Sequence, residues 1–452
     1  MNLARFLKAR AAEGRPVRVG VIGAGKFAST FLAQARTTPG LHLLGVADLD
    51  VQRARDALIR TGWDDCAVGT DFDAARKSGR VALTDDAMAL IKSDADVIID
   101  ITGSPAAGIR HALAAFDNGK HFVNVTVEAD VLAGPLLAER ARQAGVVYAL
   151  AYGDQPALVC EMVDWAEAAG FRVVAAGKGT KYLPAYERST PDTVWQHYGL
   201  SAEEARAAGM NSQMFNSFLD GTKSAIEMAA ISNATGLRAP RTGLAFPPCS
   251  ADDLSRMLIP RAAGGVLEEA GLVEVVSSLD RDGRPIARDL RWGVYIVFEP
   301  GDERGDYTRR SFKEYGIVTD SSGRYAALYR PYHLIGLELG ISVAAAALRG
   351  EATGSPTGFR SDVAAIAKKA LAPGDMLDGE GGYTVMGKLM RAEDSLAAGA
   401  FPIGLAHKVK VVRPVAEGAV LRWDDVAVPD NDTVRFRREM ERAFAPKKSA
   451  AA

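Results

Sequence analysis

The 452-residue sequence has only three cysteines, Cys66, Cys160 and Cys249, and they lie far apart. Without a Cys-x-x-Cys pair, the sequence indicates neither a disulfide framework nor a thiolate zinc site. Long apolar runs are also missing: the longest, 334–348, contains Glu338 and falls short of the roughly 20 residues that span a bilayer. Residues 1–16 carry charges among their apolar positions, unlike a secretion signal. We therefore expect packed thiols in a cytoplasmic protein.

The sequence also lacks an excess of charge of either sign. The net charge is −2, and basic residues are interspersed with acidic ones, so no surface for nucleic acid or an anionic membrane is indicated. We expect a small-molecule partner. The composition, with 48% hydrophobic and 24% charged residues, is typical of a globular α/β protein. The length exceeds what one hydrophobic core holds and predicts two or three domains.

Short apolar runs alternate with amphipathic stretches between residues 17 and 149. The runs lie at 17–22, 41–46, 97–101, 122–125 and 146–149, and helical patterns lie at 26–37, 51–61 and 105–118, after an extra helix at 3–13. Strands that alternate with helices form a parallel sheet covered on both faces. The predicted fold class is therefore α/β, with a Rossmann-type doubly wound parallel sheet.

Three domains follow from this pattern. Residues 1–155 form a dinucleotide-binding domain, joined by a return helix within 331–350. Residues 156–330 lose the regular alternation and form a central α+β domain for substrate binding, catalysis and dimerisation, with strands at 171–177 and 294–299 and helices at 202–209 and 215–236. Residues 361–445 carry compact turn-strand units and form a small β-rich domain. A homodimer is the default assembly.

The first strand leads into a Gly-Ala-Gly-Lys-Phe-Ala turn that opens a helix. The first glycine permits a tight turn, the second lets backbone N–H groups approach a pyrophosphate, and the helix N-terminus favours negative charge. We expect cofactor contacts from Gly23, Ala24, Gly25, Lys26 and Phe27. An ordinary strand-to-helix turn is the alternative interpretation.

Asp48 ends the second strand, at the position where a carboxylate hydrogen-bonds the ribose 2′-hydroxyl of NAD. Arg53 and Arg55 follow, and both are able to neutralise the 2′-phosphate of NADP. The choice between NADP and NAD therefore stays open, and both arginines fit a solvated helix face equally well.

The turns after two later strands reach the same edge of the sheet. Thr102, Gly103 and Ser104 follow the strand at 97–101, and Glu128 follows the strand at 122–125. In a doubly wound sheet these positions lie beside the nicotinamide and its ribose. We expect all four to bind the cofactor, with a simple helix N-terminus as the alternative for Glu128.

Lys178 begins a loop, ending at Thr190, that is rich in cationic and hydroxyl side chains. We predict Lys178 and Lys181 as catalytic residues and Arg188, Ser189 and Thr190 as substrate-binding residues that hold an anion or a phosphate. A solvated basic loop is the alternative.

A second cluster lies in the apolar helical stretch 215–236. Asp220, Lys223 and Glu227 are spaced i, i+3 and i+7, which places them on one helix face. Buried charges need partners or a task, and a lysine beside carboxylates polarises a carbonyl or relays a proton. We therefore predict these three as catalytic and Asn216 as substrate-binding. A surface ion-pair ladder is the alternative.

A third cluster precedes the return helix. Arg324 and Arg330 are candidates for gripping a phosphate, and His333 is a candidate proton carrier, although a lone histidine is more often structural. All three are predicted to bind substrate. The sequence has no His-x-x-x-His motif or dense carboxylate group that marks a metal. A Mg²⁺ or Mn²⁺ ion held mainly by substrate oxygens would leave little trace, so its ligands are unknown.

Several of these segments together resemble homoserine dehydrogenase-like oxidoreductases that carry a C-terminal SAF domain. They are the turn at 23–28, the loop Gly177-Lys-Gly-Thr-Lys-Tyr182 and the segment Asp220-Gly-Thr-Lys-Ser-Ala-Ile-Glu227. The segments 402–407 and 421–426 look like the SAF module itself. Within this group, the chain is most similar to the DXR-like family, the type II 1-deoxy-D-xylulose 5-phosphate reductoisomerases.

The resemblance implies an isomerisation followed by NADPH reduction to 2-C-methyl-D-erythritol 4-phosphate, in isoprenoid biosynthesis, with a divalent cation on the substrate's oxygens. It implies that 178–190 and 324–333 hold phosphate and that Lys223, with Asp220 and Glu227, faces the reacting carbons. Homoserine dehydrogenase itself is the nearest competitor, but this chain has Val125-Thr-Val-Glu128 where that family has a lysine. A cofactor-binding sensor without turnover is the third interpretation.

Overall fold

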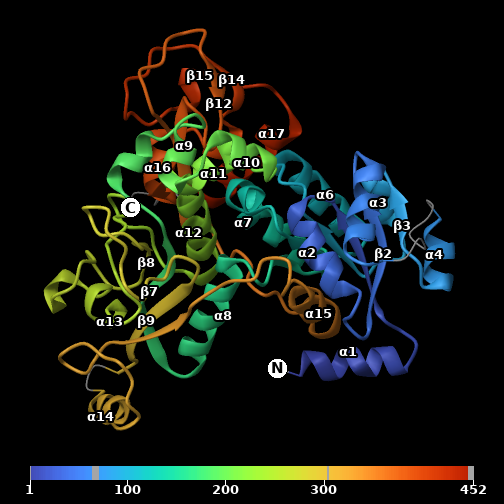
Figure 1. Ribbon diagram of the computed structural model, residues 1–452, viewed down its shortest axis with the longest axis horizontal. Coiled ribbons are helices and arrows are strands. Elements are labelled where there is room, and N and C mark those ends of the chain that lie inside the picture. Colours follow the sequence, from blue (N-terminus) through green and yellow to red (C-terminus); the bar gives the residue numbers. More distant parts are fainter. Residues whose placement is uncertain (1, 64–70, 303–304, 446–452) are drawn as a thin grey trace, which may run out of the picture. The chain divides into compact units, whose positions relative to one another are not determined.

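The computed structural model describes residues 2–63, 71–302 and 305–445 (Figure 1). They form two compact units. The first contains the chain up to Leu158 together with His333–Thr357, and the second contains Val159–Tyr332 and the segment from Gly358 onward. Cys66 lies outside the described residues, whereas Cys160 and Cys249 are thiols, the first half-buried and the second buried. In the described part of the chain, no helix is both long and apolar enough to cross a membrane.

The first unit is built on a six-stranded parallel sheet with the order β3-β2-β1-β4-β5-β6. Its strands are β1 (Val17–Ile22), β2 (Leu41–Ala47), β3 (Ala82–Thr84), β4 (Val97–Asp100), β5 (His121–Asn124) and β6 (Tyr148–Leu150). The strands are rich in buried apolar residues, as a sheet covered on both faces requires. The predicted α/β fold with a doubly wound sheet is confirmed.

Helices surround this sheet. They are α1 (Leu3–Ala12), α2 (Lys26–Ala35), α3 (Val51–Arg60), α4 (Phe72–Ser78), α5 (Ala87–Lys92), α6 (Pro105–Asp117), α7 (Val127–Gln143) and α15 (Gly340–Arg349). Phe31 of α2, Leu58 of α3 and Val343 of α15 share one core cluster with Val19 and Val21 of β1. The strand order reverses between β1 and β4, and the carboxyl ends of these two strands mark the place where such sheets bind ligands.

The second unit contains a mixed sheet with the order β10-β9-β7-β8. Its strands are β7 (Phe171–Thr180), β8 (Leu272–Ser277), β9 (Val294–Pro300) and β10 (Ala326–Arg330). The associated helices are α8 (Gln155–Ala168), α9 (Val194–Tyr198), α10 (Ala202–Ala207), α11 (Ser212–Leu219), α12 (Thr222–Thr235), α13 (Leu254–Met257) and α14 (Asp306–Glu314). Helix α12 packs against β7 and β8, and it also contacts two strands from the C-terminal part of the chain, β11 and β13.

The C-terminal part of the second unit is rich in short strands. It contains β11 (Ser361–Ala367), β12 (Met376–Asp378), β13 (Val385–Arg391), β14 (His407–Val411) and β15 (Val426–Ala427), with α16 (Ala392–Ala398) and α17 (Asp432–Phe444). Strand β11 pairs with β13, and β12, β14 and β15 form a separate small sheet. The guanidinium of Arg437 is fully buried, 2.6 Å from Asp362 and 2.9 Å from Glu441, and this network ties α17 to β11.

Two expected helices differ in the structure. The single helix at 215–236 is two helices, α11 and α12, because Gly221 adopts a φ of +88°, which interrupts the helical path. Asp220 therefore precedes α12 and does not share its face with Lys223 and Glu227. The return helix, expected within 331–350, begins only at Gly340, since Gly336 is in the left-handed region (φ +79°) where the chain approaches α2 closely. Strands β8 and β10 were not expected at all.

Candidate functional site

The glycine turn of the first unit has the backbone geometry that a pyrophosphate needs. Gly23 has a φ of +99°, and a Cβ there would lie 2.8 Å from the Ile101 carbonyl oxygen. At Gly25 a Cβ would meet nothing within 4 Å, so the backbone faces open space. Helix α2 begins directly afterwards without a side-chain cap. Its first N–H groups are therefore left for an anionic ligand, with Lys26 and Phe27 exposed beside them.

Asp48 is committed to the glycine turn. Its carboxylate accepts hydrogen bonds from the Ala24 N–H at 2.7 Å and from the Asp50 N–H at 2.9 Å. The Arg53 guanidinium pairs with the same carboxylate at 2.5 Å, and this arginine side chain is 57% exposed. The buried Asp48 carboxylate thus holds the backbone of the turn, while Arg53 presents a cation at the surface. Arg55 is not part of this arrangement.

The loop after β4 is held by a buried carboxylate, that of Asp100, which was not among the predicted site residues. Asp100 is fully buried and accepts hydrogen bonds from the Thr102 N–H at 3.1 Å, the Thr102 hydroxyl at 2.8 Å and the Thr126 hydroxyl at 3.1 Å. Its second oxygen lies 2.7 Å from Nδ1 of His111 on α6. The Gly103 N–H donates to Thr126 at 3.1 Å. This network sets the backbone of the predicted cofactor loop, in which Gly103 and Ser104 are exposed.

A second buried network lies below the start of α7. Glu128 is half-buried in the first turn of this helix, at the edge where it was predicted. Asp130, fully buried, accepts a hydrogen bond from the Tyr148 hydroxyl at 3.0 Å, and Asn124 donates to that hydroxyl at 3.1 Å. Burial raises the pKa of Asp130 to about 7, although the Tyr148 hydrogen bond works in the opposite direction. This carboxyl group therefore changes its protonation state near neutral pH.

In the second unit, Lys178 and Glu227 form a buried ion pair. Lys178 lies on β7 and Glu227 on α12, and their side chains are 6% and 4% exposed. A charge removed from water is costly unless it is paired, so each residue depends on the other. Two residues predicted separately from a loop and a helix are thus brought together.

Asp220 has a different partner, Lys368, which the sequence reading missed. The Lys368 Nζ donates to Asp220 at 2.6 Å, to the Ser189 carbonyl at 2.9 Å and to the Gly382 carbonyl at 3.0 Å. Asn216 joins the same network: it accepts from the Ser189 hydroxyl at 2.6 Å and donates to the Ser189 carbonyl at 3.0 Å. These side chains lock the corner between α11 and α12 onto the C-terminal part of the unit.

Lys181 and Lys223 are both half-buried. The Lys181 Nζ donates to the His197 carbonyl and lies 5.5 Å from the centre of the Tyr198 ring. Burial, and then the nearby Arg291 charge, lower the pKa of Lys181. Lys223 follows the Gly221 break in the first turn of α12, on the helix that carries Glu227.

The remaining predicted substrate residues are spread out. Arg188 is 82% exposed and pairs with Glu417 at 3.1 Å, and the Thr190 N–H donates to the Thr193 hydroxyl at 2.9 Å. Arg324 pairs with Glu299, which is opposite Arg172 near the start of β7, whereas Lys178 is opposite Val294. Arg324 therefore lies at the far end of the sheet from Lys178. Arg330 is at the Val294 end, and His333 belongs to the first unit.

Glu274 is a further buried carboxyl without a sequence signal. It lies on β8 and accepts hydrogen bonds from the backbone N–H groups of Val275 at 2.8 Å and of Ala245 at 3.1 Å. Burial raises the pKa of Glu274 to about 7, against the lowering effect of these backbone N–H groups. Its charge state is thus sensitive to pH near neutrality.

The similarity to solved structures is low in both sequence and superposition. A probable dehydrogenase from Thermotoga maritima is 14% identical with a TM-score of 0.37, over 75% of this chain and 90% of that chain. The myo-inositol dehydrogenase of Lactobacillus casei, in complex with NAD(H) and myo-inositol, is 16% identical with a TM-score of 0.28, over 40% and 50% of the two chains. Such values do not indicate a substrate. No curated protein matches the chain.

One family model does match. Residues 153–339 match the catalytic domain of Oxidoreductase DRL, a segment that includes Lys178, Asp220, Lys223 and Glu227 but ends before Lys368. The chain therefore carries an oxidoreductase catalytic domain. An oxidoreductase domain joined to a Rossmann-type sheet with a glycine turn is the arrangement of an NAD(P)-dependent oxidoreductase, and this confirms the predicted enzyme class.

Proposed function

We propose that the protein reduces a small phosphorylated carbonyl compound with NAD(P)H. The observation that supports this most is the Lys178–Glu227 pair, because it lies inside the segment that matches an oxidoreductase catalytic domain. A lysine buried against one carboxylate is a costly arrangement for a merely structural purpose, and such groups concentrate at functional sites.

In this proposal the nicotinamide, when bound, supplies a hydride to the carbonyl carbon. Lys178 donates a proton from Nζ to the carbonyl oxygen, so that the product is the neutral alcohol. Glu227 holds the ammonium in place. Lys223, on the same helix as Glu227, adds a positive charge that favours a phosphorylated substrate.

The specific reaction we propose is the conversion of 1-deoxy-D-xylulose 5-phosphate to 2-C-methyl-D-erythritol 4-phosphate. It is supported by the resemblance of the 177–182 and 220–227 segments to DXR-like enzymes and by the DRL catalytic-domain match. Lys181 and Arg188 are the candidates for the phosphate. Ser189 and Asn216 support them, since their side chains bond to each other and hold the loop.

For the cofactor we propose NADP. Asp48 alone favours NAD by its position at the end of β2. Its carboxylate, however, is covered by the exposed Arg53 guanidinium, and a cation at this point suits a 2′-phosphate. The open backbone at Gly25 and the uncapped start of α2 would hold the pyrophosphate of either dinucleotide.

The described residues do not fit a metal held by the protein alone. No group of three or more His, Cys, Asp or Glu residues gathers among them, and Asp220 and Glu227 are each paired with a lysine. We therefore assign no metal ligands and derive no step through a cation.

The test is a steady-state assay of NADPH and NADH oxidation with 1-deoxy-D-xylulose 5-phosphate, in the presence and absence of Mn²⁺. We expect oxidation that depends on the ketose phosphate and is faster with NADPH. Absence of turnover under all four conditions would refute the reductoisomerase reaction. Oxidation with another phosphorylated ketose or an aldehyde, and not with this one, would assign the chain to a homoserine dehydrogenase-like enzyme of different substrate.

A further inference from the structure

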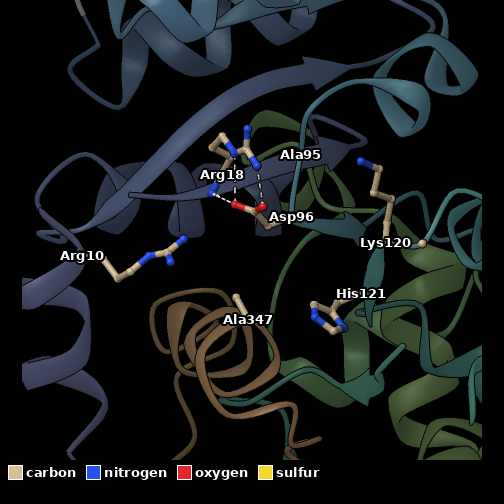
Figure 2. A pocket seen from close by; sticks show the side chains of 8 residues that line it. Arg10, Arg18, Ala95, Asp96, Lys120, His121 and Ala347 are labelled. Carbon is tan, nitrogen blue, oxygen red and sulfur yellow. Dashed lines mark hydrogen bonds and ion pairs between the residues drawn. The ribbon is translucent and has the colours of Figure 1, made fainter. Parts of the chain in front are cut away.

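A polar hollow of about 210 Å³ lies in the first unit, at the amino ends of β1, β4 and β5 (Figure 2). Arg18 is the second residue of β1, Asp96 directly precedes β4, and His121 begins β5. The glycine turn follows the carboxyl end of β1. The hollow is therefore at the opposite edge of the sheet from the predicted cofactor site. None of the predicted catalytic or cofactor-binding residues lines it.

The walls of the hollow carry an excess of positive charge. The carboxylate of Asp96 is already engaged by Arg18, which contacts it through its backbone N–H at 2.8 Å and its guanidinium at 2.7 and 3.2 Å. Arg10 and Lys120 also line the hollow. Among the described residues, neither side chain forms an ion pair. With Asp96 offset by Arg18, these two cations remain for a ligand.

Arg10 is the more informative of the two. Its Nε is buried and has no hydrogen-bond partner among the described residues. Figure 2 shows its guanidinium turned into the hollow, between Asp96 and Ala347. A buried N–H of a charged group is expensive to leave unsatisfied, so an acceptor in the hollow would remove a cost that the protein otherwise bears.

His121 contributes a neutral donor. Its Nδ1 accepts a hydrogen bond from the Val147 N–H at 3.0 Å, so the uncharged ring carries its proton on Nε2. Burial lowers the pKa of His121, although Asp96 opposes this. At neutral pH the ring therefore offers an N–H without a charge, which complements an oxygen-rich anion held by Arg10 and Lys120.

We infer that this hollow binds a phosphate group, either as free phosphate or as part of a small phosphomonoester, through Arg10, Lys120 and His121. Two cations and a neutral N–H donor line different walls of this hollow, and together they match the charge and the several acceptor oxygens of phosphate. The volume is below the roughly 300–1,000 Å³ of sites for drug-sized ligands, so the occupant is small. The inference does not depend on the proposed reaction, because it uses residues at the other edge of the sheet.

The test is calorimetric titration of the full-length protein with inorganic phosphate and with glycerol 3-phosphate, at constant ionic strength in chloride. The wild-type protein should bind one equivalent saturably. Arg10→Gln and Lys120→Gln should each weaken binding about tenfold or more, since each removes a charge-assisted contact. Arg15→Gln is the matched control, because Arg15 is exposed and paired with Glu13 outside the hollow. Tighter binding of the ester would identify a metabolite ligand, and tighter binding of phosphate the free ion.

A variant that fills the hollow tests binding without a change of charge. The signal of a residue in the hollow distinguishes binding there from binding at the cofactor site. Ala347→Phe fills the hollow without changing its charge and should abolish binding, while circular dichroism verifies that the variant is folded. The His121 ring signal, identified by its loss in His121→Gln, should shift on addition of phosphate. The inference is overturned if wild-type protein shows no saturable binding, if Arg15→Gln weakens binding equally, or if binding leaves the His121 signal unchanged.

Discussion

Lys178 on β7 and Glu227 on α12 form an ion pair that is almost entirely removed from solvent. Forty-nine positions of the chain separate the two, and the contact joins an inner strand of the mixed sheet to the helix that packs on it. Removing either side chain would take away the opposite charge that its buried partner faces. The pair therefore has both a structural consequence and, in our proposal, a chemical one, and variants can separate the two.

Lys178→Met should cost roughly 3–5 kcal/mol of stability, because it removes the buried cation that faces the Glu227 carboxylate. It should also reduce turnover by about a hundredfold to ten-thousandfold, the usual contribution of a proton donor. The double variant Lys178→Met/Glu227→Leu replaces the pair by apolar groups and should regain most of the stability without regaining turnover. Denaturant unfolding and steady-state rates measure the two effects. Recovery of activity in the double variant would show that the pair only supports the fold.

Arg53→Gln should change the cofactor preference. Removing the cation above Asp48 should weaken NADPH binding about tenfold or more and leave NADH binding nearly unchanged. Arg55→Gln makes the same charge change two residues away, without contact to Asp48, and should have little effect on either. Fluorescence titration with both nucleotides measures the ratio of affinities. Equal weakening of NADH and NADPH in Arg53→Gln would mean that Arg53 shapes the turn and does not recognise a 2′-phosphate.

Asp130 predicts a pH dependence of stability. Its folded pKa is about 7 and its ordinary value is 3.8, so between these values the native state keeps a proton that the unfolded state has lost. Stability should therefore fall as pH rises through this window, by at most about 1.4 kcal/mol per pH unit. Asp130→Asn should remove this contribution. Chemical denaturation at several pH values should then show the variant gaining stability relative to wild type as pH rises from 5 to 7.

Glu274, whose folded pKa is also about 7, provides a parallel case in the second unit. Glu274→Gln should likewise reduce the fall in stability with rising pH. Asp130→Asn alone should leave the contribution of Glu274 in place. A difference between wild type and Asp130→Asn that does not vary with pH would contradict the assignment of Asp130 as the titrating group.

Lys368 predicts an energetic connection between the C-terminal part of the second unit and the α11–α12 corner. Lys368→Met leaves Asp220 buried without its cation and should destabilise the protein by roughly 3–5 kcal/mol. The neighbouring Lys369 is exposed, so Lys369→Met should cost less than about 0.5 kcal/mol. The two variants are compared by denaturant unfolding. A similar, small effect of both would show that the Lys368–Asp220 contact carries little energy.

The parts of the protein that the sequence predicted correctly are those with local causes. The glycine turn at Gly23–Gly25 and the alternation of strands with helices follow from neighbouring residues, and both are present. The helix break at Asp220 was missed because an Asp-Gly pair inside an apolar helical pattern is compatible with a continuous helix. Only the surrounding fold requires Gly221 to adopt a left-handed conformation.

The site residues show the same limit. The pairing of Lys368 with Asp220 spans 148 positions, and a lysine next to Lys369 near a strand end carries no local signal. Asp48 was recognised by its spacing, but spacing did not reveal that its carboxylate bonds the Ala24 N–H and is covered by Arg53. Arg324 fitted a phosphate-binding pattern, yet the register of β7, β9 and β10 places it beside Glu299. Such relations depend on tertiary packing.

The most direct test of the central proposal follows a hydride. Wild-type protein is incubated with 1-deoxy-D-xylulose 5-phosphate and NADPH that carries deuterium at both C4 positions of the nicotinamide, and the product is examined by mass spectrometry. We predict a product that gains one deuterium with wild-type protein, and a rate of deuterium transfer at least about a hundredfold lower with Lys178→Met, while that variant still binds NADPH. A wild-type protein that binds NADPH but transfers no deuterium, to this ketose phosphate or to any other small phosphorylated carbonyl compound, would contradict the account.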